Sequence, residues 1–396
     1  MLSELDFDLP SCKTGCPGFP KSALLRAFAV MKCEGFEQAS DLADYLENNR
    51  IIAHFCGFDI MKPLPSQWTY TRFVHKLDNS ALKSIMAELV KKLYGLGIVD
   101  ASFIGLDSTP VMANTRFNNP KAFAGNKFSK DNPPHSDRDC RLGIHSASNQ
   151  QSEKRTQFYW GYKNHVLCDC ISGLPLFEVT TPANISDSSV AIPLLDAANR
   201  VLSVDGCTFI ADKGYDAKTI YNHVRERFAG DCVIPLNIRN TKDLRLLRVG
   251  VPLCDAGLAM NRDGKDYSGN RTRQKFCCPF KLSKDDSACP CAHERFYNGK
   301  KHRGCTKHVT IPDDYRLSID RTSSAFKKTY ALRSECERYN SRFKATGQER
   351  LWVRNMCSAQ NLNSIAAITL LAVALAAVSV GGRFSYRALK SAKRSA

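Results

Sequence analysis

The sequence predicts an α/β fold, a sheet covered by helices, with a helical region before it and a basic insertion within it. Three observations lead to this prediction. Apolar residues recur at helical spacing through residues 21–95. Short apolar runs then alternate with helical patterns from residue 103 to 236, except over 113–153, where we expect a long surface loop. Residues 239–310 are rich in Lys, Arg and Cys and show no long helical pattern, which indicates an inserted module.

Composition limits the classes of protein that the chain can belong to. Its 396 residues are enough for about two or three domains, and an apolar content of 43% excludes wholesale disorder. A net charge of +17 indicates an acidic partner, for which nucleic acid is the default and an anionic membrane surface the alternative. Seventeen cysteines in a chain of this length do not indicate a small disulfide scaffold. We expect mostly reduced thiols in a cytosol, with a subset that binds metal.

The most apolar segment lies near the C-terminus, at residues 365–380. These 16 residues are fewer than the roughly 20 that a membrane-spanning helix needs, so we predict a buried core helix. A single-span membrane anchor is the alternative. The tail that follows has five basic residues and no acid, which suits DNA phosphates or a membrane flank equally well.

Two acids follow predicted strands. Asp107 ends the apolar run that begins at residue 103, and Asp212 ends the run that begins at residue 207. In an open α/β sheet, ligands bind at the edge formed by the carboxyl ends of the strands. Two carboxylates there repel each other unless a cation or a proton lies between them, and oxygen ligands favour magnesium or manganese. The alternative is that each Asp only forms a turn after its strand.

Residues 329–347 carry a helical pattern with two distinct faces. Four polar residues fall within about 60° of one another around the predicted helix axis. They are Tyr330, Arg333, Glu337 and Lys344. The opposite, less polar face consists of Leu332, Cys336, Tyr339 and Phe343. We therefore expect one helix that packs by its apolar face and presents a single polar stripe, although an ordinary solvated face has the same pattern.

These features resemble a known family. The four polar residues have the spacing Tyr-x2-Arg-x3-Glu-x6-Lys, which resembles the signature of DDE transposases from bacterial insertion sequences, in the insertion-sequence-four-like superfamily. Residues 103–110 resemble that family's first-Asp strand, and residues 209–216 resemble its second-Asp motif. Residues 41–78 look like the helical domain that precedes the catalytic core in several of these transposases. The resemblance covers nearly the whole chain.

The resemblance implies a fold, a reaction and roles for individual residues. The α/β core would be ribonuclease-H-like, and Asp107, Asp212 and Glu337 would be catalytic and hold two Mg²⁺ (or Mn²⁺) ions. The residues that would contact DNA are Tyr330, Arg333 and Lys344. The implied reaction is metal-dependent cleavage at transposon ends and strand transfer into target DNA, by a cut-and-paste route.

The same resemblance implies partners and a location. The partners are double-stranded DNA, as terminal inverted repeats and as target, and a second copy of the chain in a homodimeric synaptic complex. No membrane is involved, and the location is the bacterial cytoplasm, at the nucleoid. Two alternatives are a catalytically silent DNA-binding protein descended from a transposase, and a membrane-anchored protein that uses residues 365–380.

We expect the chain to consist of five parts. The helical N-terminal domain would bind DNA or mediate dimerisation, and the insertion would interrupt the core. The parts are residues 1–98 (helical domain), 99–238 (core, first part), 239–312 (basic cysteine-rich insertion), 313–382 (core, second part) and 383–396 (basic tail). Residues 239–310 carry 16 Lys+Arg and 7 Asp+Glu, so 16 − 7 = +9 of the +17 lies there.

The cysteines of the insertion are candidates for a structural zinc site. Cys278, Cys289 and Cys305, with Cys254 as the fourth ligand, would form a tetrahedral site. Cys291 or a histidine is an alternative fourth ligand, and unligated cysteines in a small basic module are the alternative to zinc. Outside the insertion, we expect His165 to be a strand residue with a structural hydrogen bond and not a catalytic base.

Overall fold

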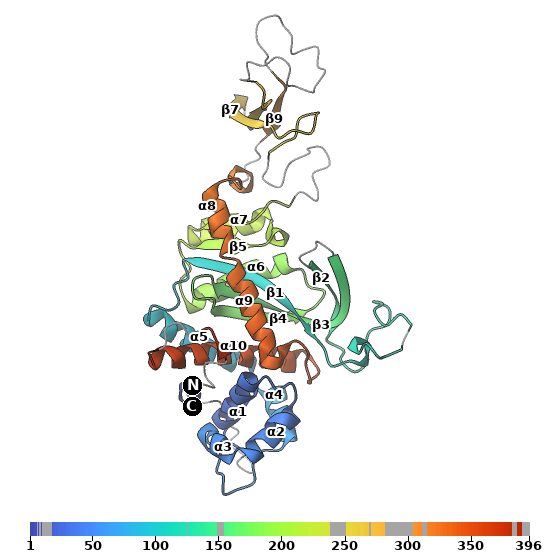
Figure 1. The fold of residues 1–396 in the computed structure, drawn as a ribbon, viewed down its shortest axis with the longest axis vertical. Helices are drawn as coiled ribbons and strands as arrows, with labels where there is room; N and C mark the ends of the chain where they lie inside the picture. Colours follow the sequence, from blue (N-terminus) through green and yellow to red (C-terminus); the bar gives the residue numbers. More distant parts are fainter. Residues whose placement is uncertain are drawn as a thin grey trace, which may run out of the picture. The chain divides into compact units, whose positions relative to one another are not determined.

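The computed structural model describes residues 1–5, 7, 9, 18–123, 125–148, 154–237, 251–268, 271–281, 304–310, 315–381 and 386–389 (Figure 1). The chain divides into two compact units. The first comprises Met1–Phe209 and Leu332–Ala396, and the second comprises Ile210–Ala331. The division into five parts predicted from the sequence stays a prediction.

The N-terminal part of the first unit is helical, as the periodicity predicts. After a short 3₁₀ turn at Leu2–Leu5, its helices are α1 (Lys21–Glu34), α2 (Ala39–Asn48), α3 (Arg50–Cys56), α4 (Gln67–Lys76) and α5 (Asn79–Gly95). Helix α5 begins after Asp78, whose carboxylate accepts a hydrogen bond from the Ser80 amide. Helix α1 ends at Gly35, whose φ of 76° is the left-handed conformation that a helix C-terminus favours in glycine.

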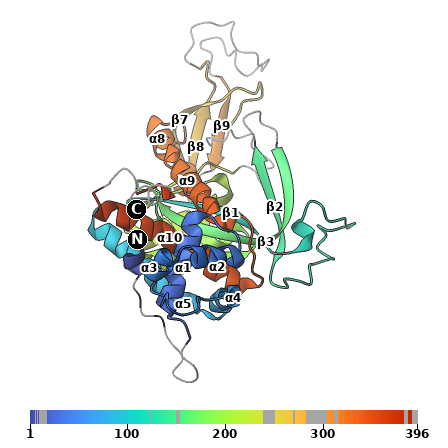
Figure 2. The same ribbon diagram turned by 60° about the horizontal axis from the view of Figure 1, so that its bottom comes forward.

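Antiparallel strands form the sheet of the first unit. They are β1 (Phe103–Met112), β2 (Arg141–Ser148), β3 (Lys154–Asp169) and β4 (Pro175–Pro182). The first half of β3 pairs with β2, and its second half pairs with both β1 and β4. Figure 2 shows β2 and the first half of β3 as a hairpin that projects beyond the other strands.

The prediction of a surface loop over residues 113–153 is wrong in part, because strand β2 lies within this range. It lies at an edge of the sheet, and its Ile144 is 61% exposed. An edge strand that buries little apolar surface leaves almost no alternating pattern in the sequence, and for that reason the polar composition of the segment was misleading.

The two faces of this sheet are covered by different helices. Residues paired across antiparallel strands share a face, so Asp107 of β1, Val166 of β3 and Glu178 of β4 lie on the same side. On that side lie α5, α9 (Ser334–Phe343) and α10 (Met356–Ser379). On the other side lies α6 (Asp187–Val201), where the Asp187 carboxylate accepts a hydrogen bond from Lys163 at 2.9 Å.

Helix α10 confirms the prediction of a core helix near the C-terminus. It is the one helix in the described residues that is long and apolar enough to cross a membrane, but residues 358–375, except Gln360, are buried within the first unit. Its polar side chains bond to neighbouring elements: Asn361 donates to the carbonyls of Val74 and Leu77 at 2.8 Å each, and Ser364 donates to Glu178 at 2.7 Å. These contacts suit a helix surrounded by protein and not by lipid.

The second unit contains short strands and helices. Strand β5 (Thr208–Ala211) crosses from the first unit into the second. The other elements are α7 (Lys218–Phe228), β6 (Asp231–Val233), α8 (Ser324–Ala331) and a separate three-stranded sheet of β7 (Asn261–Ser268), β8 (Arg271–Cys277) and β9 (Thr306–Thr310). The buried Arg321 donates to the Ile234 carbonyl at 2.8 Å and to the Tyr221 hydroxyl at 3.1 Å.

A lysine is fully buried in the core of the first unit. Lys32 of α1 donates through Nζ to Oε1 of Gln348, and Gln348 donates in turn to Asn363 of α10 at 2.7 Å. Asn363 then donates to the Thr180 hydroxyl of β4 at 2.9 Å. Burial lowers the pKa of Lys32 to about 7, because the charged ammonium is poorly solvated there. This polar chain links the N-terminal helices to the sheet.

The shifted pKa of Lys32 predicts that stability depends on pH. Between about pH 7 and the unfolded pKa of about 10.4, the unfolded chain binds the proton and the folded chain does not, so stability rises with pH. We expect the free energy of unfolding to rise by about 2 kcal/mol between pH 7 and pH 9 from this group. Urea unfolding at the two pH values measures it. Lys32→Met should remove this rise, whereas Lys91→Met, at an exposed site on α5, should keep it. An equal rise in both variants contradicts the prediction.

Candidate active site

Asp107 lies in the middle of β1 and not at its end. The ladder with β3 continues from Asp107–Val166 to Met112–Gly161, because β3 provides pairing partners along the whole of β1. The expectation that Asp107 ends its strand is therefore wrong, and the carboxylate projects from the face of the sheet that α9 covers. Its side chain is 20% exposed.

Helix α9 packs on this face by the side that the sequence predicts. Cys336, Tyr339 and Phe343 are fully buried, and Glu337 is exposed. The Cys336 thiol forms a hydrogen bond with the Cys168 thiol of β3, which raises the pKa of Cys336 well above its usual value. The contact between helix and strand is thus neutral and apolar, and all cysteines in the described part of the chain are free thiols.

Arg333 joins the carboxylates of Asp107 and Glu337. Its Nη2 donates to Oε1 of Glu337, and its Nη1 lies 3.9 Å from Oδ2 of Asp107. Two acids from distant parts of the chain, on β1 and α9, therefore face one cationic group. Carboxylate oxygens arranged around a positive charge are a donor set that suits a hard divalent cation. No three His, Cys, Asp or Glu side chains within the described ranges are grouped closely enough to hold a metal.

Asn340 is a site residue that the sequence analysis missed. Its Nδ2 donates to Oδ2 of Asp107 at 3.0 Å, and its Oδ1 is buried and has no hydrogen-bond partner among the described residues. It follows Glu337 by three positions, which places the two on the same face of α9. This spacing is the signal that would have identified it.

The predicted helix over 329–347 is not continuous. Helix α8 ends at Ala331 and α9 begins at Ser334, because the carbonyls of Leu332 and Arg333 accept hydrogen bonds from the amides three residues later, at 3.0 Å each. The prediction of a single helical stripe is therefore wrong. A tight turn of this kind keeps nearly the same residue period, so the apolar pattern does not reveal it.

The four polar residues of that pattern lie in or next to three different helical elements of the structure. Arg333 and Glu337 stay together, as described above. Lys344 begins a wide helical turn (Lys344–Gln348) after α9, and its Nζ lies 3.9 Å from Oε1 of Glu349. Tyr330 belongs to α8 of the second unit, where its ring stacks on Phe326 with centroids 6.0 Å apart.

Asp212 follows β5 directly, as expected, and belongs to the second unit. Its carboxylate accepts a hydrogen bond from the Gly214 amide at 2.6 Å, within the turn Lys213–Tyr215. A Cβ at Gly214 would lie 2.8 Å from that carboxylate, so glycine permits this close approach. The turn-forming role is thus present, and the convergence of Asp212 with Asp107 and Glu337 stays a prediction.

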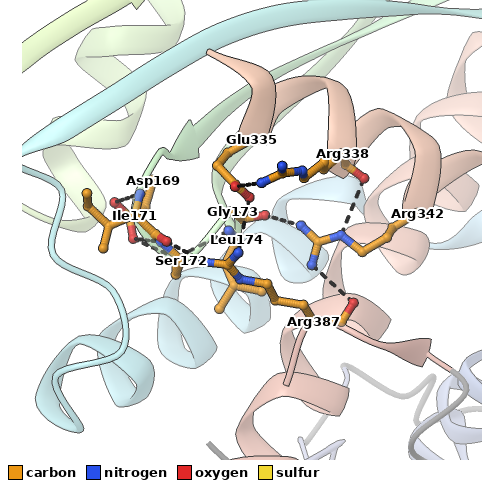
Figure 3. A network of polar contacts seen from close by, with 9 residues as sticks. All are labelled: Asp169, Ile171, Ser172, Gly173, Leu174, Glu335, Arg338, Arg342 and Arg387. Carbon is orange, nitrogen blue, oxygen red and sulfur yellow. Dashed lines mark hydrogen bonds and ion pairs between the residues drawn. The ribbon is translucent and has the colours of Figure 1, made fainter. Parts of the chain in front are cut away.

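A cluster of ion pairs fixes α9 against the turn between β3 and β4 (Figure 3). The buried Glu335 accepts a hydrogen bond from Arg338, and Arg387 lies 3.5 Å from its second oxygen. Arg342 donates to the Gly173 carbonyl and, at 3.4 Å, to the Arg387 carbonyl. The position of Glu337 therefore depends on contacts made by its neighbours on the same helix.

Asp169 stabilises the turn between β3 and β4, to which Arg342 of α9 donates a hydrogen bond. Its carboxylate accepts hydrogen bonds from the Ile171 amide at 3.2 Å and from the Ser172 amide and hydroxyl at 2.9 and 2.5 Å (Figure 3). An Asp that bonds to the amides that follow it is a common means of stabilising a tight turn. The carbonyl that Arg342 binds is thus held in place from the strand side.

His165 has the structural role that we expected. Its Nε2 lies 2.8 Å from the Thr181 hydroxyl of β4, and the side chain is fully buried. Burial lowers the pKa of His165 to about 4, so the ring is neutral near pH 7.

The candidate zinc ligands lie in the second unit, apart from Cys289, which lies outside the described residues. Cys254 packs with Met260 and Phe276 in a small apolar core that Cys305 contacts. The Cys278 amide donates to the Cys305 carbonyl at 2.9 Å. The three described cysteines do not form a metal-binding group with other described residues, and the zinc site stays a prediction.

Comparison with known proteins identifies the family. Residues 91–373 match the model of the transposase DDE domain, and the chain belongs to this family. The protein is therefore a DDE transposase, and DNA transposition is the process in which its family acts. No curated protein sequence matches the chain.

Two solved structures have weaker similarity. The first is piggyBac transposase in a synaptic complex with hairpin DNA, with 11% identity and a TM-score of 0.41 over 98% of this chain and 73% of that chain. The second is Mos1 transposase in a paired-end complex with the left transposon end, with 14% identity and a TM-score of 0.18 over 57% of this chain and 62% of that chain. The family assignment rests on the sequence match.

The hydrogen bonds of Arg342 to the β3–β4 turn and to Arg387 predict that truncation of the Arg342 side chain lowers the stability of the protein. Arg342→Ala removes charged hydrogen bonds to two carbonyls, so we expect the free energy of unfolding to fall by about 2 kcal/mol. Urea unfolding measures this change. Ser341→Ala, at an exposed neighbouring position on α9, is the matched control and should change little. Equal stabilities of the two variants would show that these hydrogen bonds are not energetically important.

Proposed function

We propose that the chain is an active transposase of the insertion-sequence-four-like superfamily, which cleaves transposon ends and transfers them into target DNA by a cut-and-paste route. The observation that carries this proposal is the approach of Asp107 on β1 and Glu337 on α9 to a common cationic group. Acids this far apart in sequence come together without an evident structural need, since α9 packs through its other face. The antiparallel strands β1 and β3, covered by α9, are consistent with a ribonuclease-H-like core.

The proposed metal ligands are Asp107, Asp212 and Glu337, which would hold two Mg²⁺ or Mn²⁺ ions. When bound, the ions lower the pKa of a water or a DNA 3′-hydroxyl and stabilise the leaving oxygen in an in-line phosphoryl substitution. The first two of these acids come from β1 and from the turn after β5, and the third comes from α9.

The other residues of the site act on DNA or on the acids. Arg333, which lies close to both carboxylates, would be a bidentate donor to a DNA phosphate. Lys344 contributes a point charge, and Tyr330 a hydroxyl for a phosphate oxygen. Asn340 orients the Asp107 carboxylate through its amide hydrogen bond.

We propose the remaining features by analogy with the same superfamily. The helical residues 1–98 bind DNA or mediate dimerisation, and two copies hold two transposon ends in the synaptic complex. The basic insertion grips DNA, with zinc as its structural ion. The protein acts at the nucleoid in a bacterial cytoplasm. A catalytically silent DNA-binding descendant is the alternative function, and the retention of all three acids together with Lys344 argues against it.

The three acids predict a complete dependence of cleavage on each carboxylate. Asp107→Asn, Asp212→Asn and Glu337→Gln should each lower Mg²⁺-dependent cleavage of transposon-end DNA by at least about a hundredfold, because each removes a negative charge from the metal ligands. The substrate is a duplex that carries the inverted repeat flanking the gene, and gel analysis of its cleaved ends measures the rate.

A matched control keeps this test specific. Glu88→Gln removes an exposed carboxylate on α5 and should cleave like the parent chain. Unchanged cleavage by one of the three site variants would remove that residue from the assignment. Parent protein that binds the inverted repeat but never cleaves it with Mg²⁺ or Mn²⁺ would favour the catalytically silent alternative.

Asn340 predicts a smaller effect with a distinct signature. Asn340→Ala removes the hydrogen bond that orients Asp107, so cleavage should fall by about 10- to 100-fold and the Mn²⁺ concentration for half-maximal activity should rise. Direct titration of Mn²⁺ into the variant should show the same weakening. Asn340→Gln, which retains the amide, should recover part of the loss. A lower rate with unchanged Mn²⁺ affinity would argue against this positioning role.

A further inference from the structure

A basic hollow lies beside the segment that joins β1 to β2, within the first unit. It has a volume of about 600 Å³, and both basic and apolar side chains line it. The basic residues are Lys130, Arg138 and Arg141, with His135 beside them, and the apolar residues include Leu142 and Trp160. No Asp or Glu is among the described residues that line it. Lys130 and Arg138 make no ion pair within the described part of the chain, so their charge is available to a ligand.

Two of the three acids in the same segment bond to residues outside the hollow, and the third, Asp131, is exposed and does not line it. Asp137 is buried, and both of its oxygens accept hydrogen bonds from the Tyr162 hydroxyl, at 2.8 and 2.9 Å. Burial and this carboxylate raise the pKa of Tyr162, which remains a neutral donor. Asp139 accepts a hydrogen bond from the Met356 amide at the start of α10, at 2.9 Å. The two acids nearest in sequence to Arg138 thus anchor the segment and leave the hollow positive.

The wall of the hollow is held to β3 by specific bonds. The indole Nε1 of Trp160 donates to the Lys127 carbonyl at 2.7 Å. Asn118 accepts from the Trp160 amide at 2.9 Å and donates to its carbonyl at 2.7 Å. The cationic side chains therefore project from a preorganised backbone, which reduces the entropy lost when a ligand binds.

The register of the sheet relates the hollow to Asp107. Asp107 pairs with Val166, and Leu142 pairs with Trp160. Val166 and Trp160 are six positions apart on β3, so their side chains share a face and lie about 20 Å apart along the strand, at 3.4 Å per residue. Duplex DNA rises 3.4 Å per base pair, so this length corresponds to about six base pairs.

We propose that the basic hollow binds the phosphodiester backbone of duplex DNA within about six base pairs of the bond that is cleaved at Asp107. The position along the DNA rests on the proposed function, whereas the binding itself does not. Arg138 and Lys130 contact phosphate oxygens, and the bonded acids Asp137 and Asp139 keep these cations aimed outward. The hollow holds the DNA in register on the face of the sheet that carries the candidate acids.

The test measures DNA affinity as a function of salt. Full-length Arg138→Gln and Lys130→Gln are compared with Lys91→Gln, which removes the same charge from an exposed site on α5. Each hollow variant should bind the inverted-repeat duplex more weakly, and its slope of log affinity against log salt should fall by about 1, since one fewer counterion is released. Lys91→Gln should match the parent, and equal melting temperatures exclude misfolding.

A second measurement locates the contact. Ethylation of single phosphates should weaken binding of the parent chain at one or more positions within about six base pairs of the cleaved bond, and Arg138→Gln should lose that sensitivity. Unchanged slopes and unchanged ethylation patterns in both hollow variants overturn the inference even if the parent cleaves DNA. Reduced slopes in a parent background that never cleaves DNA support binding at the hollow and reject the proposed function instead.

Discussion

The packing of α9 on the second half of β3 decides where the candidate catalytic groups of the first unit lie. Cys336, Tyr339 and Phe343 bury one side of the helix, which leaves Glu337 exposed and paired with Arg333. Without a second attachment, a ten-residue helix on a sheet could rotate or slide. The clamp of Arg342 on the β3–β4 turn supplies that attachment, so Arg333 and Asn340 reach Asp107 from a helix whose register is set elsewhere.

Polar bonds buried in the core extend this constraint to the rest of the first unit. Lys32 of α1 bonds to Gln348, the last residue of the wide turn that follows α9, and Gln348 bonds to Asn363 of α10. Gly347 of that turn, at φ 80°, approaches the Phe36 carbonyl so closely that a Cβ would lie 2.8 Å from it. The N-terminal helices therefore pack on the chain that follows α9, and their stability and the position of α9 are coupled.

Much of this arrangement was predictable from residue patterns, and the exceptions have physical reasons. The buried strands and helices carry strong periodicity, and the sequence pattern indicates both Asp107 and Glu337 as candidate acids. The edge strand β2 buries too little to leave a pattern, and the turn at Leu332 and Arg333 is too short to interrupt the apolar spacing in the sequence. Asn340 was missed because an amide carries no charge, so its importance depends on a contact with Asp107 that only the fold creates.

The net charge of a chain indicates a binding surface only when the ion-pair partners of its charged side chains are known. The net charge of +17 indicates an acidic ligand, yet it does not distinguish cations held in ion pairs from cations left to solvent. Arg338 and Arg387 form ion pairs with the buried Glu335, and Lys83 forms one with the buried Glu178. These three cations therefore have structural roles. Around Arg138 the reverse holds, because the neighbouring acids Asp137 and Asp139 bond to Tyr162 and Met356 and leave the guanidinium without an ion pair among the described residues. A positive field built in this way persists when the surface is hydrated, because Asp137 and Asp139 are each held by their own hydrogen bonds.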